Sequence, residues 1–404
     1  MKILIIGGVA GGASAAARLR RLNEEAEIVM FERGNYISFA NCGLPYYIGG
    51  KIRERENLLV QTPAGMGSRF NIDVRINTEV VKIDRQAKAV EVKNTKTGDT
   101  YVEAYDYIVL SPGAEPVRPP IPGIEGPNIF SLRSLDDTDR ISRYLSQAEA
   151  KSVIIVGGGF IGLEMAENIH ALGAKVTVVE ASSQVMAPLD PEMAGIVHRH
   201  MTGKGVRLLL NQGVTSFADY NGKKNLTLQS GEVISADAVI LAIGVKPESE
   251  LAKEAGLELG DRGTVRVNEY MQTSDPSIYA VGDVTEAVDF VNGYKTYIPL
   301  AGPANRQGRI AADNIAGRKV FYKGTQGTSI AKVFDLAVAC TGNNEKTLTR
   351  LGISYEKSYT VNASHAGYYP GAIPINIKLI FDSKGKILGA QAVGVKGVDK
   401  RIDV

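Results

Sequence analysis

The residue with the clearest capacity for chemistry is Cys42, one of only two cysteines among 404 residues. It stands in the run SFANCG, whose small and polar residues are not typical of an apolar core. Pro45 near the start and Gly49-Gly50 at the end predict a short helix that opens beside Cys42. A thiol at a helix N-terminus has a lowered pKa and reacts as the thiolate, so we expect Cys42 to be reactive. Cys340, in the alternating run FDLAVACTG, is predicted to be a packed strand residue.

A glycine loop at 157–162 gives the strongest nucleotide-binding signal. Gly157, Gly159 and Gly162 form G-x-G-x-x-G between an apolar strand and a helix, a pattern that permits a tight turn, close approach of a pyrophosphate and helix–strand packing. The helix N-terminus offers free N–H groups to the phosphates. Glu180 ends the next strand, about 20 residues on, where an acid accepts hydrogen bonds from a ribose 2′-hydroxyl. The loop predicts an NAD(P)H site, and Glu180 favours NADH over NADPH because its charge repels a 2′-phosphate.

A similar loop, GGVAGG, opens the chain at 7–12. Gly7 and Gly12 hold the outer positions of the fingerprint, whereas Val9 stands where its second glycine would be. Glu32 ends the following strand, as Glu180 does in the second unit. By itself this loop leaves two interpretations open, a second dinucleotide site and a plain glycine turn.

The run TSDPSIYAVGDV decides between these interpretations. Asp283 follows a strand and a glycine far along the chain, which suits an acceptor for the ribityl hydroxyls of a flavin. Two dinucleotide folds followed by YAVGD resemble the two-dinucleotide-domain flavoprotein reductases over essentially the whole chain. The resemblance implies FAD in the first fold and around Asp283, and NAD(P)H in the second. Electrons would pass from nicotinamide through flavin to a third group.

The absence of a second cysteine near Cys42 limits which group can accept the electrons from the flavin. A dithiol reductase of that superfamily carries a second cysteine five positions on, where this chain has Tyr47, so a dithiol site is excluded. A single thiol can attack a disulfide or persulfide and hold half of the substrate as a mixed disulfide. It can also cycle through sulfenic acid to reduce peroxide or oxygen. A third alternative is electron transfer to a small iron–sulfur protein, with Cys42 uninvolved.

Three runs taken together, SFANCGLPYYIGG, IIGGVAGGASAAARLRRL and SHAGYYPGA, resemble the coenzyme A-disulfide reductase family. Among its members the resemblance is closest to those that reduce CoA persulfides and polysulfides. It implies a Cys42–S–S–CoA mixed disulfide next to the flavin. Single-cysteine oxidases and peroxidases carry a histidine in the first glycine loop, and Val9 and Ala10 here disfavour that alternative. The family's later tyrosine and lysine segment and its rhodanese domain do not occur before Val404, so we expect the last domain to be truncated.

The same resemblance assigns roles to individual residues. Tyr368 is expected to reach the partner subunit's cysteine in a homodimer and to hydrogen-bond the thiolate or protonate a leaving thiol; the alternative is that Tyr368 and Tyr369 only pack the dimer interface. Arg18 and Arg21, three apart on the first helix, suit CoA phosphates or form a solvated basic face. Phe160 resembles the aromatic gate that covers the flavin until nicotinamide arrives. The other expected substrate contacts are Ser38, Asn41 and Asn305; the expected FAD contacts are Gly7, Gly12, Glu32, Arg33, Val81, Asp283 and Ala301; and the expected NAD(P)H contacts are Gly157, Gly159, Phe160, Ile161, Gly162, Glu180 and Gly244.

The elements that must position these residues predict an α/β fold. Strand, glycine loop, helix and strand recur at 1–35 and 151–182, and an alternating, turn-rich stretch typical of antiparallel strands follows each unit. We therefore expect two Rossmann-like dinucleotide-binding domains and an α+β dimerisation domain. The predicted segments are FAD-binding at 1–112 and 246–322, NAD(P)H-binding at 113–245 and dimerisation at 323–404, where the final run DKRIDV indicates the start of a helix.

Composition supports this class of protein. The chain is 44% hydrophobic and 22% charged, with a net charge of +2, which disfavours general attraction to nucleic acid or membrane. No apolar run approaches the roughly 20 residues of a membrane helix. Two cysteines so far apart do not make a disulfide framework, which predicts a reducing, cytoplasmic setting. No metal-ligand spacing occurs.

Overall fold

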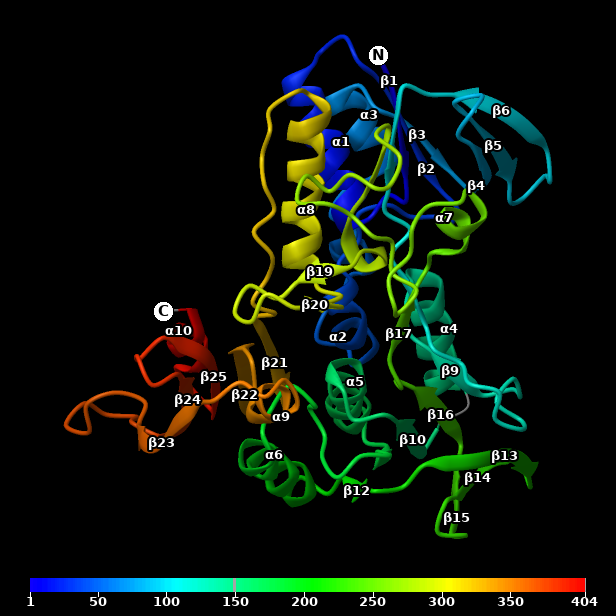
Figure 1. The fold of residues 1–404 in the computed structure, drawn as a ribbon. Helices are drawn as coiled ribbons and strands as arrows, with labels where there is room; N and C mark the ends of the chain where they lie inside the picture. The colour runs from blue at the N-terminus through cyan, green and yellow to red at the C-terminus, as the bar shows by residue number, and fades with distance from the viewer. Residues whose placement is uncertain (148–149, 404) are drawn as a thin grey trace. The chain divides into compact units, whose positions relative to one another are not determined.

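The computed structural model describes residues 1–147 and 150–403, which form two compact units (Figure 1). Each unit combines segments that are far apart in the sequence, so long-range packing and not chain order defines it. The first unit contains Met1–Ala40, Arg55–Glu115 and Val245–Thr325; the second contains Asn41–Glu54, Pro116–Gly244 and Gln326–Val404.

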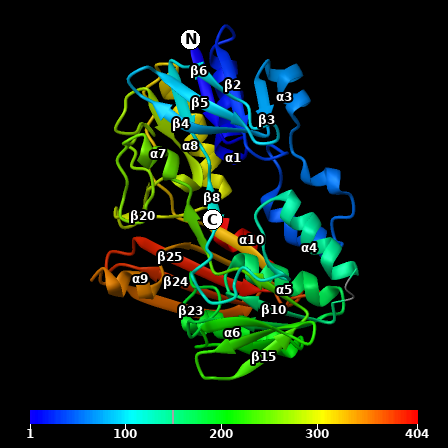
Figure 2. The ribbon, with the colours of Figure 1, turned by 90° about the vertical axis from the view of Figure 1, so that its right-hand side faces the viewer.

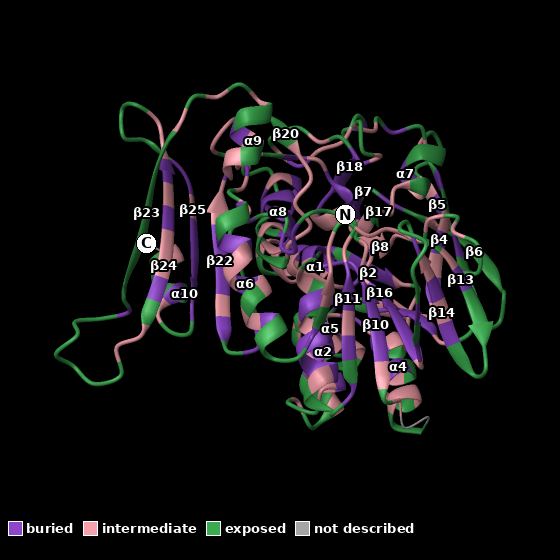
Figure 3. Cartoon of the chain, turned by 90° about the horizontal axis from the view of Figure 1, so that it is seen from below, coloured by how far each residue is buried: buried purple, intermediate pink, exposed green. Residues whose placement is uncertain are grey.

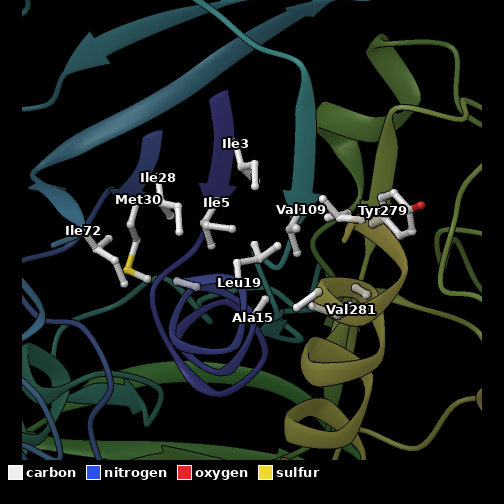
Figure 4. Packing of buried hydrophobic residues seen from close by; sticks show 14 of the residues in the cluster. Ile3, Ile5, Ala15, Leu19, Ile28, Met30, Ile72, Val109, Tyr279 and Val281 are labelled. Carbon is white, nitrogen blue, oxygen red and sulfur yellow. The ribbon is translucent and has the colours of Figure 1, made fainter. Parts of the chain in front are cut away.

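A five-stranded parallel sheet forms the centre of the first unit, in the order β18-β7-β1-β2-β3. Its strands are β1 (Lys2–Ile6), β2 (Glu27–Glu32), β3 (Asp73–Ile76), β7 (Tyr107–Leu110) and β18 (Ile278–Ala280). The last four residues of β1 are all buried, as expected for a parallel strand covered on both faces. Ile3 and Ile5 from β1 face Ala15 and Leu19 of α1 (Ala10–Leu22) in one apolar core (Figure 4). Helix α8 (Ala301–Ile315) packs beside α1 and completes that core.

Smaller elements surround this sheet. An antiparallel sheet of β4 (Thr78–Asp84), β5 (Ala89–Asn94) and β6 (Thr100–Ala104) confirms the alternation predicted for this stretch (Figure 2). The remaining elements of this unit are η2 (Arg55–Leu58), α3 (Pro63–Phe70), β17 (Val245–Pro247), α7 (Glu250–Glu254), η3 (Gly282–Val284), β19 (Ala287–Val288) and β20 (Lys295–Thr296), and β8 (Ala114–Pro116) lies where the chain leaves it.

The second unit repeats the same design. Its parallel sheet has the order β12-β11-β10-β16-β9. The strands are β9 (Ile129–Ser131), β10 (Ser152–Val156), β11 (Lys175–Val179), β12 (Arg207–Leu209) and β16 (Ala238–Leu241). The helices are α4 (Leu135–Gln147), α5 (Phe160–Ala171) and α6 (Pro191–Gly203), and an antiparallel sheet consists of β13 (Val214–Tyr220), β14 (Lys223–Leu228) and β15 (Val233–Ala236). The predicted duplication of a strand–loop–helix–strand unit is confirmed.

A five-stranded antiparallel sheet with two short helices completes the second unit. Its order is β21-β22-β25-β24-β23, with β21 (Ser329–Val333), β22 (Leu336–Gly342), β23 (Glu356–Ala363), β24 (Pro374–Phe381) and β25 (Ile387–Gly394). The helices are α9 (Glu345–Arg350) and α10 (Val398–Asp403), so the helix predicted from DKRIDV is confirmed. Strand β23 is exposed along its whole length, whereas β25 is mostly buried (Figure 3). The α/β class with a third, α+β part is thus confirmed.

Candidate active site

The first glycine loop joins β1 to α1 in the first unit. A Cβ on Gly12 would lie 2.0 Å from the carbonyl oxygen of Gly7, so only glycine allows the helix to begin this close to the strand. The carboxylate of Glu32, at the end of β2, accepts hydrogen bonds from the Gly8 amide at 3.0 Å and the Gly34 amide at 2.9 Å. The structure therefore brings Gly7, Gly12 and Glu32 together at the carboxyl ends of the parallel strands, where dinucleotides bind in such folds.

A second feature of this unit fits FAD. Asp283 lies in η3, directly after β18. The hydroxyl oxygen of Tyr297 is buried and has no hydrogen-bond partner among the described residues. Burial and the charge of Asp283 raise the pKa of that phenol. A buried hydroxyl without a partner beside an aspartate suits a polar ligand, so the residues of this unit fit a flavin nucleotide.

The other predicted FAD contacts also lie in the first unit. Arg33 follows β2 and forms an ion pair with Glu248. Val81 is in β4, and Ala301 is the first residue of α8. Their contact with FAD stays a prediction.

The second glycine loop joins β10 to α5 in the second unit. A Cβ on Gly162 would lie 2.1 Å from the Gly157 carbonyl oxygen, which repeats the close contact of the first loop. By contrast, no atom lies within 4 Å of a Cβ built on Gly159, so the space above the second glycine is open where a pyrophosphate would approach. The Glu180 carboxylate accepts from the Gly158 amide at 2.7 Å and from the Ser182 amide at 2.8 Å. These residues fit a dinucleotide, and the preference for NADH stays a prediction.

The remaining predicted nicotinamide contacts belong to the same unit. Phe160 and Ile161 are the first two residues of α5, and 38% of Ile161 is exposed. Gly244, just after β16, has a φ of 110°, and the space that a Cβ on it would occupy is open. Phe160 lies one turn before Glu164 on the same helix.

Cys42 lies in η1 (Asn41–Gly43), immediately before α2 (Leu44–Ile48), so the short helix predicted from Pro45 and Gly49 is confirmed. The thiol is free and the residue is exposed, whereas Cys340 is buried in β22 as predicted. The expected lowering of the Cys42 pKa is wrong. Partial burial of the sulfur and the negative charge of Glu164 raise the pKa of the thiol, and a backbone hydrogen bond offsets only part of this.

The side chains around Cys42 come from α2 and α5, which pack together in the second unit. Burial and the charges of Glu164 and Glu167 raise the pKa of the Tyr46 phenol, one turn after Cys42. Lys51 forms an ion pair with Glu167, whose Oε2 also accepts from the Phe334 amide at 2.9 Å. Burial and the charge of Glu167 raise the pKa of Glu164 to about 7. Cys42 therefore has an acidic neighbour that titrates near neutral pH.

The predicted substrate residues are distributed over both units. In the first unit, the Ser14 hydroxyl donates to Asn305 at 2.7 Å, and the Ser38 amide donates to the Gly8 carbonyl at 2.8 Å. Arg18 donates to Asp313 at 2.7 Å. The other predicted substrate residue on α1, Arg21, lies over the Phe70 ring at 5.4 Å, so the two arginines have different neighbours; Asn41, in η1, belongs to the second unit. Binding of CoA by these five residues stays a prediction.

Tyr368 lies between β23 and β24 and is 93% exposed, and Tyr369 is 67% exposed. The Tyr369 ring meets the His365 ring edge-on at 5.7 Å, whereas Tyr368 extends into solvent. The role of Tyr368 at the cysteine of a partner subunit stays a prediction.

The pattern of the pyridine nucleotide-disulphide oxidoreductases matches residues 1–308, and that of their dimerisation domain matches residues 328–404. The chain belongs to this family. The FAD- and NAD(P)H-dependent class of enzyme and the dimerisation domain predicted from the sequence are thereby confirmed. Within the described residues, no three metal-ligating side chains lie together, and no helix has the length and apolar character to cross a membrane.

Individual members of the family are similar to this chain over its whole length. A coenzyme A disulfide reductase of Staphylococcus haemolyticus is 37% identical over all of this chain and 90% of its own length. An NADH oxidase of Methanocaldococcus jannaschii is 36% identical with the same coverage. Among solved structures, Bacillus anthracis CoADR-RHD is 57% identical with a TM-score of 0.98, over all of this chain and 72% of its own. An NAD-dependent persulfide reductase from A. fulgidus is 39% identical with a TM-score of 0.96, over all of this chain and 75% of its own. The predicted similarity to CoA-disulfide reductases is confirmed.

Sequence reasoning missed the acidic neighbours of Cys42 in this oxidoreductase. Tyr46 follows Cys42 by one helical turn in LPYYI, and Glu164 follows the glycine loop by one turn in FIGLE. Both residues lie in segments that the sequence predicts to be helical. Their proximity to Cys42 depends on the packing of α2 on α5, which no local pattern indicates. An acid one turn into the helix after a dinucleotide loop, with a tyrosine one turn after the cysteine, is the signal that could have found them.

Proposed function

We propose that this protein is an FAD- and NADH-dependent reductase of CoA disulfide or CoA persulfide that works as a cytoplasmic homodimer through Cys42. The single observation that carries the proposal is the free thiol of Cys42, an exposed residue with tyrosine five positions on, in a member of a disulfide oxidoreductase family. With only one thiol on this loop, the substrate must supply the second sulfur.

Atoms and electrons balance in this reaction. The Cys42 thiolate attacks one sulfur of CoA disulfide, so the CoA S–S bond breaks, a Cys42–S–S–CoA bond forms and a CoA thiolate leaves. Two electrons from NADH then break the mixed disulfide and regenerate the Cys42 thiolate and a second CoA thiolate. The hydride of NADH carries these two electrons and one proton. That proton and one proton from solvent protonate the two CoA thiolates, so the products are NAD+ and two CoA thiols. FAD, when bound, supplies the transfer of these electrons from nicotinamide to sulfur.

The chain's own residues would serve this reaction in four ways. Gly7, Gly12, Glu32 and Asp283 would hold FAD, and Gly157, Gly159, Gly162 and Glu180 would hold NADH. Ser38, Asn41, Asn305, Arg18 and Arg21 would bind CoA. Tyr368 would reach Cys42 of the other subunit and hydrogen-bond the thiolate. Two free cysteines are compatible with the proposed reducing compartment.

A second candidate is NADH oxidation by oxygen or peroxide through a Cys42 sulfenic acid. The similarity to the M. jannaschii protein named NADH oxidase favours it. Val9 and Ala10 in the first glycine loop argue against it. The single-cysteine oxidases and peroxidases that the chain resembles carry a histidine in that loop.

The test compares Cys42→Ser with Cys340→Ser as the matched control, since Cys340 is the other free thiol. We expect Cys42→Ser to lose CoA disulfide and persulfide reduction by at least about 100-fold, while NADH still reduces the bound FAD at the wild-type rate. Cys340→Ser should keep turnover. Anaerobic assays with CoA disulfide, CoA persulfide and peroxide rank the substrates, and normal turnover by Cys42→Ser contradicts the proposal.

A further inference from the structure

A side chain from a distant helix holds the turn that carries Asp283. This residue lies in η3, just after β18, and the amide of its neighbour Gly282 donates a hydrogen bond to Oε1 of Gln307 in α8 at 2.7 Å. Gln307 is only 2% exposed, and most of the other buried residues of α8 are small or apolar. A buried polar side chain is unfavourable unless it forms a hydrogen bond, so the contact with this turn accounts for a glutamine at this position.

The backbone of the turn is fixed on both sides of Gly282. This glycine has a φ of 80°, a conformation that it adopts without strain. Its carbonyl oxygen accepts hydrogen bonds from the Thr285 hydroxyl at 2.9 Å and from the Thr285 amide at 3.0 Å, and Thr285 is only 3% exposed. Because the Gly282 amide is bound to Gln307 and its carbonyl to Thr285, the backbone leading into Asp283 cannot rotate without breaking a hydrogen bond.

Helix α8 also packs closely on the first glycine loop. A Cβ on Gly308 would lie 2.3 Å from the Gly11 carbonyl oxygen, so only glycine lets α8 pack this closely on α1. A Cβ on Gly11 would in turn lie 2.9 Å from Cγ2 of Val281, the residue just before η3. Val281 belongs to the apolar core that α1 shares with the sheet (Figure 4). One helix thus contacts both segments that the proposed function assigns to FAD, the loop at 7–12 and the turn at 282–284.

We propose that Gln307 is a positioning residue for FAD, because its side-chain oxygen fixes the turn at 282–284 in the form that lets Asp283 accept from the ribityl hydroxyls. The inference rests on the proposed function, which takes Asp283 as a ligand of FAD. Gly308, next to Gln307, fixes the same helix against the first glycine loop, so α8 sets the spacing between the two segments that hold the cofactor. Such preorganisation lowers the cost of ordering the site when FAD binds.

Asn314 provides a matched comparison on the same helix. Its side-chain amide donates to the carbonyl oxygens of Tyr270 and Val320 at 3.0 Å and 2.9 Å, and its Oδ1 accepts from the Val320 amide at 2.8 Å. Asn314 lies two helical turns after Gln307 and fixes the C-terminal end of α8. Loss of either side-chain amide removes hydrogen bonds to the backbone, but these partners of Asn314 lie outside the turn that carries Asp283.

The test measures the rate at which FAD leaves the diluted holoenzyme, from the rise in flavin fluorescence. Gln307→Met keeps the length of the side chain but leaves the Gly282 amide without its acceptor, so FAD release should be about tenfold faster or more. Thr285→Val removes the hydroxyl that donates to the Gly282 carbonyl and should also speed release. Asn314→Leu should lower the unfolding midpoint, as Gln307→Met does, but should release FAD within about twofold of the wild-type rate.

A double-mutant cycle determines whether Gln307 acts through Asp283. Asp283→Ala should also speed the release of FAD. Adding Gln307→Met to this variant should change the rate by no more than about twofold, because the side chain that the turn positions is already absent.

Three results would overturn the proposal: release at the wild-type rate by Gln307→Met, equally fast release by Gln307→Met and Asn314→Leu, and effects that multiply in the double variant. Release at the wild-type rate by Asp283→Ala would remove Asp283 from the FAD site, and the inference would fall with that assignment. Reduction of CoA disulfide is measured separately in the wild type, so failure of that reaction would be distinguished from failure of the role of Gln307.

Discussion

The ammonium nitrogen of Lys378 lies 2.8 Å from the carboxylate of Asp190, and both side chains are completely buried. Lys378 comes from β24, and Asp190 is the N-cap residue of α6. Glu192 and Glu345 also hydrogen-bond the same ammonium group. Burial opposes the charge of Lys378, but these three carboxylates outweigh it and raise the pKa of the lysine. The cluster joins the antiparallel sheet of the second unit to its dinucleotide-binding part.

Loss of Lys378 should destabilise the protein. Lys378→Met removes the cation that neutralises Asp190 in this buried cluster, and an uncompensated buried charge costs about 3–5 kcal/mol. Lys357→Met is the matched control, because Lys357 pairs with the same Glu345 at 2.8 Å but is 53% exposed, and it should cost no more than about 1 kcal/mol. Urea unfolding followed by circular dichroism measures both, and equal losses contradict the account.

The same cluster predicts loss of stability in acid. Burial alone would raise the pKa of Glu345, but hydrogen bonds from Lys357, Lys378 and Tyr355 prevail and lower it to about 2. Because the folded pKa lies below the unfolded value of about 4.3, the stabilisation is complete above that value and is lost as pH falls toward 2. Glu345→Gln should therefore flatten the fall in unfolding free energy between pH 5 and pH 2. A variant as steep as wild type would show that Glu345 does not contribute.

Glu180 should determine the choice of nicotinamide nucleotide. Glu180→Ala removes the carboxylate that repels a 2′-phosphate, so kcat/KM for NADPH relative to NADH should rise by about tenfold or more. Ser182→Ala is the control, since it removes a neighbouring hydroxyl that donates to Glu180 at 2.6 Å but keeps the carboxylate. Its ratio should stay near wild type. An unchanged ratio in Glu180→Ala places nucleotide selection elsewhere.

Tyr368 should matter for turnover and not for folding. Its side chain is 93% exposed in the single chain, so Tyr368→Phe should leave the unfolding midpoint unchanged. If its hydroxyl serves the thiolate of the partner subunit, turnover with CoA disulfide should fall by about tenfold or more. Tyr369→Phe provides the comparison and should stay within about twofold. Equal turnover in both variants would support simple interface packing.

Features encoded in short stretches could be predicted from the sequence, whereas features that join distant stretches could not. The strand, glycine loop and helix around Gly7 and Gly157 follow from local periodicity and turn chemistry, and the structure confirms them. The short helix after Cys42 was predictable in the same way. The pKa of Cys42 was not, because it depends on desolvation and on Glu164, which approaches only when α5 packs on α2.

The ion pairs show the same division. Lys51 and Glu167 are 116 positions apart in the chain, and Lys378 and Glu192 are 186 apart. No local pattern marks such pairs, since a lysine in an apolar strand is equally consistent with a solvent-facing residue until the whole sheet is assembled. Lys378 is in fact fully buried.

The most direct test of the central claim is the mass of the species on Cys42 after the holoenzyme is mixed with one equivalent of CoA disulfide in the absence of NADH. The account predicts a single CoA moiety on the Cys42 peptide, none on Cys340, and its release as CoA thiol when NADH is added. Cys42→Ser should carry no adduct. Added oxygen on Cys42 without CoA, or CoA attached elsewhere, would contradict reduction through a Cys42–S–S–CoA bond.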